Sequence, residues 1–340
     1  MHFRSNFLQE GELPAMPNIK QLAEAAGVSV STVSRVLNGH PYVREDKRQA
    51  VYKAIERLQY TRNMNAVHLV KGATQTIGVI LPQINNAYFG KVVEGIGQQA
   101  LQVNYQLMLC QTGYRTHEER KALHMLRDKI VDGLIIISRS LSLNQIEKYA
   151  AYGPITLCEE VRGRPLSCVY FDHYASFQKA LIYLWSKGHR RIGYTVNRRN
   201  SASSATRHKA YLETLASLGG EGREAWIFDN CLHLEDGAVL LNKIISMDDP
   251  PTALLVTGDQ VAAGLTIAAQ KQGVQIPDDL ALIGLDNQPI SKLLGITTID
   301  NRLNEIGAEA FRIVYRHISE QTDSTTIQEL GFKLIERSSV

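Results

Sequence analysis

Residues 18–38, NIKQLAEAAGVSVSTVSRVLN, contain the signals of two short helices joined by a tight turn. Asn18 is a residue type that caps a helix, because its side-chain oxygen accepts a backbone N–H group of the first turn. Gly27 can adopt the left-handed backbone conformation that ends the first helix. The residues between them that recur at helical spacing are expected to face inward: Leu22, Ala23 and Ala26.

The second of these helices has an outer face that suits a DNA groove. Ser29 is its expected cap, and its buried face is expected to comprise Val33, Val36 and Leu37. The opposite face has small or polar side chains and no acidic ones: Val30, Ser31, Ser34 and Arg35. A helix whose outer face lacks bulk and negative charge can enter a major groove and contact base edges. The alternative is an ordinary helix pair of a globular core.

The same stretch resembles the helix-turn-helix of the lactose-repressor/purine-repressor (LacI/GalR) family of bacterial transcriptional regulators. The segments AGVS at 26–29 and TVSRVLN at 32–38 carry the resemblance over both helices and the turn. It implies a repressor that binds a palindromic double-stranded DNA operator as a homodimer or a tetramer. The DNA-contacting residues that it implies in this motif are Ser29, Val30, Ser31, Thr32, Ser34, Arg35 and Asn38.

Positive charge is concentrated near the N-terminus. Residues 17–71 contain nine Lys or Arg and four Asp or Glu, whereas the whole chain has a formal net charge of only +3. A basic region at one end of a nearly neutral chain indicates that this end meets a polyanion such as DNA. A solvated charged surface is the alternative explanation.

Three segments are expected before the body of the protein. Residues 1–16 lack the apolar centre of a secretory signal, so we interpret them as an N-terminal extension, with Met16 as an alternative start. Residues 17–62 are the expected helix-turn-helix domain. Its third helix is predicted over 43–58, with an inner face of Val51, Ile55 and Leu58.

Residues 63–74 correspond, by the same resemblance, to a hinge helix and linker that lie in the minor groove. The implied contacts are Asn63, Ala66 where two hinges touch, and Leu69 as a wedge between base pairs. An eight-residue helix is marginal in water, so we expect it to order only on DNA and against its dimer mate. The alternative for Leu69 is a linker leucine that packs on the body.

From Thr76 onward, short apolar runs alternate with amphipathic stretches, which predicts an α/β fold of parallel sheets with helices on both faces. Nine strands in two series indicate two subdomains: 77–81, 105–110, 133–137, 155–158, 168–171, then 191–196, 225–228, 253–257 and 281–285. The helices expected between them include 89–104, 117–129, 174–187, 206–218, 235–245 and 260–272.

Two segments of the body match the same family: VQIPDD at 274–279 and IGLDN at 283–287. The resemblance implies a body like a periplasmic sugar-binding protein over residues 75–340, which binds the effector and forms the dimer. It also implies that the chain crosses between the two lobes three times. The N-subdomain then covers about 75–172 and 302–330, and the C-subdomain about 173–301 and 331–340.

Ligands of open parallel sheets bind beyond the carboxyl ends of the strands. Carboxylates and amides bind sugar hydroxyls in directed pairs, and aromatic rings stack on the apolar face of a sugar. By resemblance, the effector-binding residues are Asn86, Tyr88, Phe89, Asp172, Arg207, Asp259 and Asp286. Arg207 is expected at the beginning of its helix. Local roles are the alternatives: helix capping for Asp172 and Asp259, a surface ion pair for Arg207, and bracing of the hinge between lobes for Asp286.

Composition and spacing argue against several other classes. The chain is 44% apolar and 21% charged, and no apolar run approaches membrane-spanning length. The four cysteines, Cys110, Cys158, Cys168 and Cys231, are far apart, which indicates no zinc or dithiol site and fits a reducing cytoplasm.

No Gly-rich phosphate loop, nucleophile elbow or metal-ligand spacing indicates an enzyme or a bound cofactor. A sugar-binding receptor without a DNA function is the alternative class. The effector is expected to be a sugar or sugar derivative, with a nucleoside or purine as the alternative. Its identity, and whether it releases DNA or promotes binding, stay open.

Overall fold

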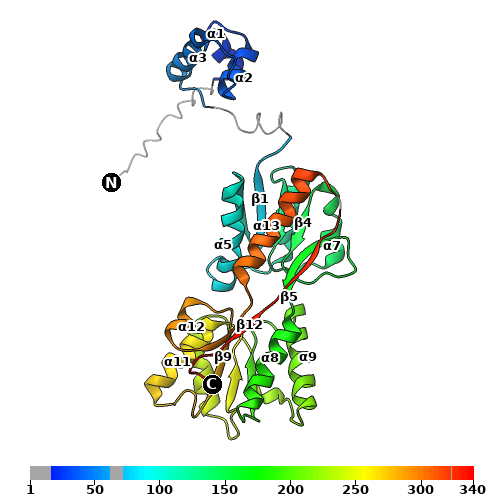
Figure 1. Cartoon of the computed structure of the whole chain (residues 1–340), viewed down its shortest axis with the longest axis vertical. Helices are drawn as coiled ribbons and strands as arrows, with labels where there is room; N and C mark the ends of the chain where they lie inside the picture. The colour runs from blue at the N-terminus through cyan, green and yellow to red at the C-terminus, as the bar shows by residue number, and fades with distance from the viewer. Residues whose placement is uncertain (1–16, 62–71, 323) are drawn as a thin grey trace, which may run out of the picture. The chain divides into compact units, whose positions relative to one another are not determined.

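The computed structural model describes residues 17–61, 72–322 and 324–340 (Figure 1). The chain divides into two compact units, Met1–Gly72 and Ala73–Val340, which we call the headpiece and the body. The expected N-terminal extension and the expected hinge contacts Asn63, Ala66 and Leu69 lie outside the described residues.

The headpiece is a bundle of three helices, α1 (Ile19–Ala25), α2 (Val30–Leu37) and α3 (Glu45–Leu58). Asn18 caps α1 in a reciprocal capping box with Gln21, and Ser29 caps α2 through the Thr32 backbone nitrogen, as the sequence predicts. Gly27 has a φ of +65°, so the predicted left-handed turn is confirmed. The core of the bundle consists of Leu22, Ala23, Val33, Val36, Val51 and Ala54.

The third helix begins at Glu45, two residues later than expected. Arg44 takes the cap position but makes no side-chain cap hydrogen bond, because a guanidinium has no acceptor atom, and it pairs with Asp46. Glu45 and Asp46 lie in the first turn, where negative charge is favourable to the helix dipole. Tyr60 packs on the bundle core just after α3 ends.

The first lobe of the body is a six-stranded parallel sheet in the order β11-β5-β4-β3-β1-β2. Its strands are β1 (Thr76–Leu81), β2 (Gln106–Gln111), β3 (Gly133–Ile136), β4 (Ile155–Leu157), β5 (Ser167–Phe171) and β11 (Ile327–Leu330). Helices α5 (Ala87–Gln102) and α13 (Leu303–Glu320) share one core with this sheet. Helices α6 (Thr116–Arg127) and α7 (Leu143–Glu147) share a second, and the short 3₁₀ helix η1 (Ala150–Tyr152) follows α7.

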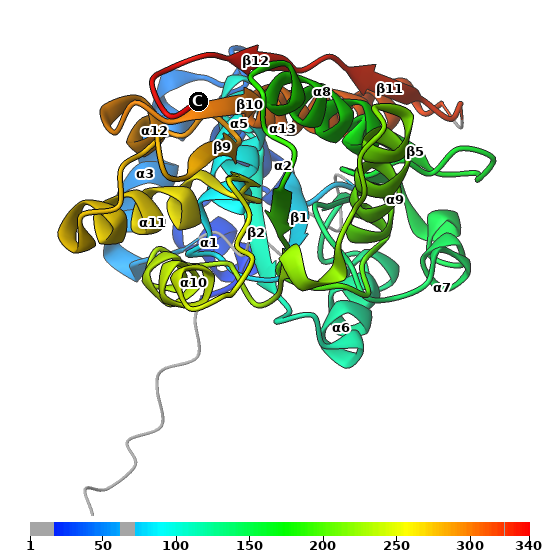
Figure 2. The same cartoon turned by 90° about the horizontal axis from the view of Figure 1, so that it is seen from below.

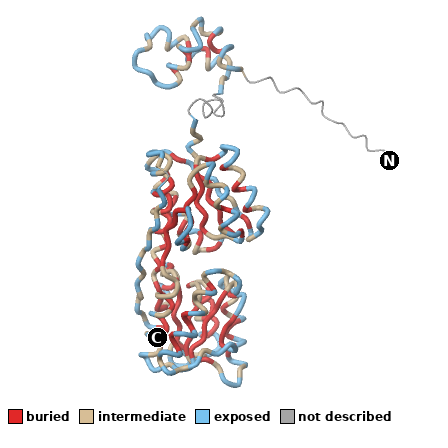
Figure 3. Tube along the Cα trace, turned by 90° about the vertical axis from the view of Figure 1, so that its right-hand side faces the viewer, coloured by how far each residue is buried: buried red, intermediate tan, exposed pale blue. Residues whose placement is uncertain are grey.

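The second lobe is a six-stranded sheet in the order β12-β10-β9-β8-β6-β7. Its strands are β6 (Ile192–Thr195), β7 (Ile227–Phe228), β8 (Ala253–Leu255), β9 (Ala281–Leu285), β10 (Thr297–Asp300) and the antiparallel β12 (Lys333–Ile335). Helices α8 (His173–Ser186) and α9 (Ala202–Ser217) cover one face, whereas α10 (Asp236–Ile245), α11 (Asp259–Gln272) and α12 (Pro289–Leu293) cover the other (Figure 2). Burial is concentrated on the strands of both lobes (Figure 3).

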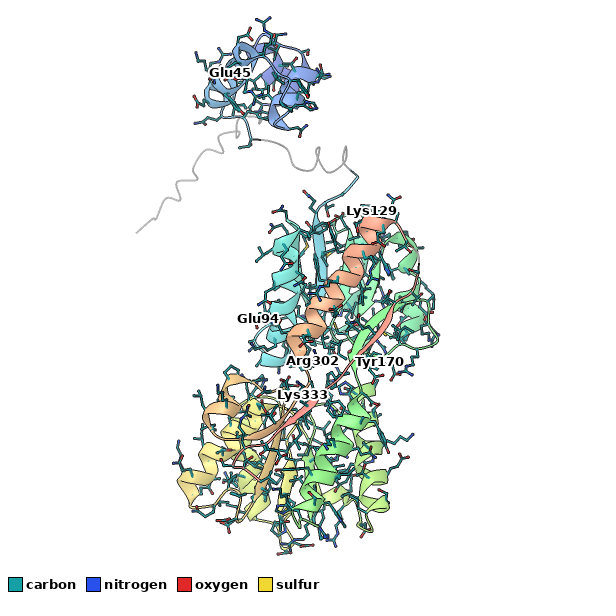
Figure 4. The ribbon with its side chains drawn as sticks, in the orientation of Figure 1. Glu45, Glu94, Lys129, Tyr170, Arg302 and Lys333 are labelled. Carbon is teal, nitrogen blue, oxygen red and sulfur yellow. The ribbon has the colours of Figure 1, made fainter. Side chains whose placement is uncertain are left out.

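The chain crosses between the lobes three times, at residues 171–173, 300–303 and 330–333. Figure 4 labels Arg302 and Lys333, which lie on two of these connections. The α/β fold with a three-helix headpiece and a two-lobed body of parallel sheets is therefore confirmed. Because β5, β10 and β11 each end at a crossing, the chain ties the two lobes together at three points.

Several expected element boundaries are wrong. The structure has twelve strands in its described residues, not nine: β10, β11 and β12 are short, and β11 and β12 are partly exposed, so they lack the apolar run that marks a buried strand. Half of the strand expected over 225–228 belongs to the 3₁₀ helix η2 (Glu224–Trp226), and the other half is the two-residue β7. Helix α9 begins at Ala202 because Ser201 caps it, so Arg207 lies in its second turn and not at its beginning.

The contact between α5 and α13 depends on two glycines. A Cβ at Gly95 would lie 1.9 Å from the backbone oxygen of Asn304, and one at Gly307 would lie 2.0 Å from that of Val92. The backbones of the two helices therefore touch directly. These helices cover one face of the first lobe, so its packing leaves no room for a methyl group at either position.

We predict that Gly95→Ala lowers the free energy of unfolding of the body by about 1–3 kcal/mol or more, because overpacking forces the two helices apart. The control is Gly90→Ala in the same helix, where an added Cβ would meet no atom within 4 Å. Alanine there is expected to raise stability by about 0.5–1 kcal/mol. Denaturant titration measures both changes, and indistinguishable midpoints would contradict the direct backbone contact.

Candidate functional sites: a groove-reading helix and an interlobe cleft

The outer face of α2 is open to solvent within the headpiece. Ser31 and Arg35 are not buried, and Val30 is 41% exposed. Val33 and Val36, on the opposite side, are buried. Helix α2 is therefore amphipathic, with one side packed in the bundle and the other side open to solvent within this unit.

The hydroxyl groups at the start of α2 form a local network. Ser29 Oγ lies 2.9 Å from both Ser31 Oγ and Thr32 Oγ1, and it accepts the Thr32 backbone N–H at 3.2 Å. At the other end of the helix, the Asn38 amide donates to Ser34 Oγ at 3.4 Å. These contacts orient short polar groups on the exposed side of α2.

The electrostatics of this face favour DNA. Arg35 forms no ion pair with any residue of the described ranges, and α2 contains no acidic residue. By contrast, Arg44 pairs with Asp46, and Arg57 donates to the Ala25 carbonyl at 3.1 Å, so these two arginines support the bundle. Arg35 is thus available for a phosphate or a base edge.

A cleft between the two lobes of the body is the second site. The volume of this cleft is about 170 Å³, at least ten times what one water molecule needs. Both lobes line it with polar and aromatic side chains, among them Gln83, Asn86, Tyr88, Phe89, Tyr114, Ser138, Glu159, His173, Asn197, Arg198, Ser201, Arg207, Asp286 and Gln288. A mixed lining of this kind suits a small polar ligand.

Five of the seven residues expected to bind the effector line this cleft. Asn86 caps α5 by accepting the Tyr88 backbone N–H at 2.9 Å, and its amide nitrogen donates to no described residue. The rings of Tyr88 and Phe89 meet edge to face, with centroids 5.2 Å apart. The other two lining residues are Arg207 and Asp286.

Arg207 and Asp286 form the charged centre of the cleft. Burial lowers the pKa of the Arg207 guanidinium, and the nearby Asp286 carboxylate opposes that shift. Arg207 Nη2 lies 3.2 Å from His173 Nδ1. Burial lowers the pKa of His173 well below its ordinary value, and Arg207 lowers it further, so this imidazole is neutral at pH 7 and can accept from Arg207.

Asp286 is held in a strained backbone conformation at the end of β9. Its φ is +92°, and its backbone nitrogen donates to the Ile299 carbonyl at 2.7 Å. The Asn301 amide donates to Asp286 Oδ1 at 2.9 Å. Burial raises the pKa of the Asp286 carboxyl to about 6, against the opposing effects of Asn301 and Arg207. Strain that neighbouring bonds maintain is typical of functional sites.

Asp172 and Asp259 do not line the cleft. Asp172 Oδ1 caps α8 and accepts the backbone N–H groups of Tyr174 and Ala175 at 2.8 and 3.0 Å. Asp259 is fully buried at the first residue of α11, where it accepts from the Gln288 backbone at 2.6 Å and from Thr298 Oγ1 at 2.7 Å. Its neighbour Gly258 occupies the cap position, so Asp259 links α11 to β10 and does not cap its own helix.

Many residues that line the cleft were missed by the sequence interpretation, among them Arg198, His173 and Tyr114. Arg198 lies next to Asn197 at the end of β6, so its position after a strand could have indicated it. His173 follows Asp172 in the same way. Tyr114 had no such signal, because it follows a turn after β2 and reaches the cleft only through the fold.

An exposed helix that presents Arg35, followed in the chain by a two-lobed body with a polar cleft, defines the class of DNA-binding regulators with an effector-binding domain. Comparison with known families agrees with this class. Residues 18–63 match the bacterial regulatory proteins of the lacI family, and residues 74–337 match the periplasmic binding proteins and sugar binding domain of the LacI family. The chain belongs to the LacI family and is a transcriptional regulator, not an enzyme.

Individual relatives span nearly the whole chain. An uncharacterized HTH-type transcriptional regulator, YkvZ of Bacillus subtilis, is 42% identical over 96% of this chain and 100% of its own length. Catabolite control protein B of Bacillus subtilis is 37% identical over 88% of this chain and 94% of its own. The Lac repressor dimer bound to operator and the anti-inducer ONPF has a similar fold, with a TM-score of 0.82, 22% identity and coverage of 96% and 99%.

In residues 17–61, 72–322 and 324–340, no helix is both long and apolar enough to cross a membrane. The same part of the chain contains no cluster of three His, Cys, Asp or Glu side chains that could hold a metal ion.

We predict that the Asp259 carboxyl stabilises the folded body at low pH and that this contribution is lost as the pH rises from about 4 to 7. Burial, and to a smaller extent the nearby Asp286 carboxylate, raise the pKa of the Asp259 carboxyl to about 7. The same group titrates near pH 3.9 in an unfolded chain. Between these values the folded state binds more protons than the unfolded state, so raising the pH favours unfolding. Asp286 adds to the same trend.

Asp259→Asn removes the larger of these two titrations. We expect the difference in free energy of unfolding between this variant and the parent protein to change over this pH range, as measured by denaturant titration at several pH values. If the curves of the variant and the parent protein ran parallel, the assignment of the titration to Asp259 would be wrong.

Proposed function

We propose that this protein is a dimeric repressor of carbohydrate-use genes that acts in the cytoplasm on a palindromic operator. A sugar-like effector in the interlobe cleft is proposed to control its affinity for DNA. The observation that carries the proposal is the exposed outer face of α2, with Ser31 and Arg35 positioned to enter a major groove.

The lining of the cleft supports a sugar-like effector. Gln83 Oε1 is buried with no hydrogen-bond partner in the described residues, and the Asn86 amide nitrogen is likewise available. A hydroxyl group can donate to the first and accept from the second. Tyr88 offers an aromatic surface beside them. The family description of residues 74–337 as a sugar binding domain points the same way.

The effector acts in this proposal through the two lobes. Since both lobes contribute contacts, a bound ligand has different affinities for open and closed arrangements of the lobes, and only such a difference can shift their populations. A change in one lobe relative to the other, repeated in the second subunit, would alter the spacing of two headpieces on the operator.

Two experiments test this function separately. Gel-shift assays on genomic fragments at several salt concentrations test sequence-selective, salt-sensitive DNA binding. A thermal-shift screen with sugars, sugar derivatives and nucleosides tests effector binding, because a ligand that binds the native state raises its melting temperature. Absence of any selective DNA binding would remove the proposed function, even if a sugar stabilised the protein.

We predict that Arg35→Ala weakens binding to the selected operator far more than binding to unrelated duplex. An arginine on a base edge contributes about 1–3 kcal/mol of discrimination, which corresponds to roughly 5- to 150-fold in affinity. Lys53→Ala, an exposed charge on α3, is the control and should reduce both affinities equally. Fluorescence anisotropy measures the dissociation constants of the parent protein and of both variants for the operator and for the unrelated duplex. Equal losses for Arg35→Ala would mean that Arg35 contacts only phosphate.

We propose that the dimer forms through apolar side chains exposed on β2 and α10. Strand β2 is the edge of its sheet, and its Met108 and Leu109 are 37% and 38% exposed. On α10, Val239 is 69% exposed and Ile245 is 52% exposed. Unpaired strand edges and exposed apolar side chains are typical of surfaces that a partner covers.

Val239→Asp is expected to shift the protein from dimer to monomer, because a carboxylate would be desolvated in that interface. Ile182→Asp on α8, which covers the opposite face of the same sheet, is the matched control at a side chain that is 43% exposed, and it should leave the dimer intact. Sedimentation velocity at micromolar concentration distinguishes the two species. A dimer for both variants, or a monomer for both, would rule out α10 as part of the interface.

A further inference from the structure

One arginine that lines the interlobe cleft has no carboxylate partner among the described residues. Glu159 is ion-paired with Arg139. Asp286 is the carboxylate that most favours the charged form of Arg207. Arg198 is left over: it lines the cleft and forms no ion pair with any residue that the structure describes.

Arg198 is fixed in place by a residue of the other lobe. Its Cζ atom lies 3.6 Å from the ring centroid of Tyr114, whose hydroxyl oxygen is 3.4 Å from Ser138 Oγ. Arg198 Nη1 is buried and has no hydrogen-bond partner in the described part of the chain. The ring covers one face of the guanidinium, and the N–H groups project from its edge, so the edge is the part left to a ligand.

The next residue in the chain, Arg199, shows how carboxylates neutralise an arginine in this loop. Arg199 is exposed, and it pairs with Asp229 at 2.6 Å and also with Glu224. Two carboxylates thus neutralise the outer arginine, whereas the inner one, which faces the cleft, pairs with none of the described carboxylates. A buried guanidinium nitrogen without a hydrogen-bond partner is costly, so an acceptor of negative charge beside Arg198 Nη1 would be favourable.

Hydroxyl groups and backbone N–H groups at the beginning of α9 belong to the same cleft. Ser201, Ser203 and Ser204 line the cleft at the first turn of α9, a helix of 16 residues. Ser201 Oγ already caps the Ser204 backbone nitrogen at 3.1 Å. The first N–H groups of a helix favour an anion, both as donors and through the helix dipole.

We propose that the effector of this protein carries an anionic group, a phosphate monoester or a carboxylate, that binds to Arg198 and the first turn of α9. The inference rests on the proposed effector role of the cleft and adds the chemical class of the ligand. The hydroxyl groups of a neutral sugar could accept from Arg198 Nη1 but would leave the guanidinium without a counter-charge. A phosphate, with a charge of about −1.5 to −2 at pH 7, accepts two N–H groups of an arginine edge at once.

The full-length dimer is tested with four probes at constant ionic strength: glucose, glucose 6-phosphate, glucuronate and inorganic phosphate, with chloride as the reference salt. Isothermal titration and thermal shift are measured for the parent protein, for Arg198→Gln and for the matched control Arg199→Gln. We expect an anionic probe to raise the melting temperature above the chloride value in the parent and in Arg199→Gln. Its affinity should fall roughly 10- to 100-fold in Arg198→Gln, as loss of a charged hydrogen-bond partner predicts.

Comparison of the probes identifies the anionic group. A response to the two phosphates alone assigns a phosphate monoester, and a response to glucuronate alone assigns a carboxylate; either result supports the proposal. An equal response of Arg198→Gln and the parent, a response to glucose that both share, or no response beyond chloride would overturn it. Arg198→Lys keeps the charge and should retain part of the response, which provides a folded variant if Arg198→Gln is unstable.

The DNA-binding assay is run on the same samples without probes. Selective operator binding by a parent protein that ignores every anion would overturn only this inference. Loss of selective operator binding would overturn the proposed function instead.

Discussion

The strands of the two parallel sheets direct their carboxyl ends toward one cleft, and this constraint places the polar side chains of the proposed effector site. Asn86 follows β1, Tyr114 follows β2, Ser138 follows β3 and Glu159 follows β4. The second lobe repeats the plan, with Asn197 and Arg198 after β6, Thr257 after β8 and Asp286 after β9. Strand interiors are occupied by the apolar core, so chemistry is confined to these ends.

The elements that depend on local periodicity and helix capping were predicted from the sequence. Asn18, Ser29 and Gly27 determine the ends of α1 and α2 through contacts within a few residues, so the headpiece could be inferred in detail. The alternation of strands and helices indicated the α/β class for the same reason. Strands β11 and β12 were not predicted, because each forms only at the edge of a sheet and neither has an apolar run of its own.

The cleft could be predicted only in part, because its geometry depends on contacts between distant residues. An aspartate after a strand looks the same in sequence whether it caps a helix, as Asp172 does, or joins two elements, as Asp259 does. Tyr114 and Arg198 are 84 positions apart in the chain and belong to different lobes. Their contact follows from the three crossings, which no local pattern encodes.

The Arg198–Tyr114 contact also suggests how a ligand could act on the lobes. If the lobes separate, Arg198 loses the ring and gains water, so its charge is then stabilised by hydration. If they stay together, the buried edge of the guanidinium needs a negative partner. An anion at this position would therefore stabilise the closed arrangement more than the open one, and such a difference in affinity is the condition for a ligand to control a distant DNA-binding unit.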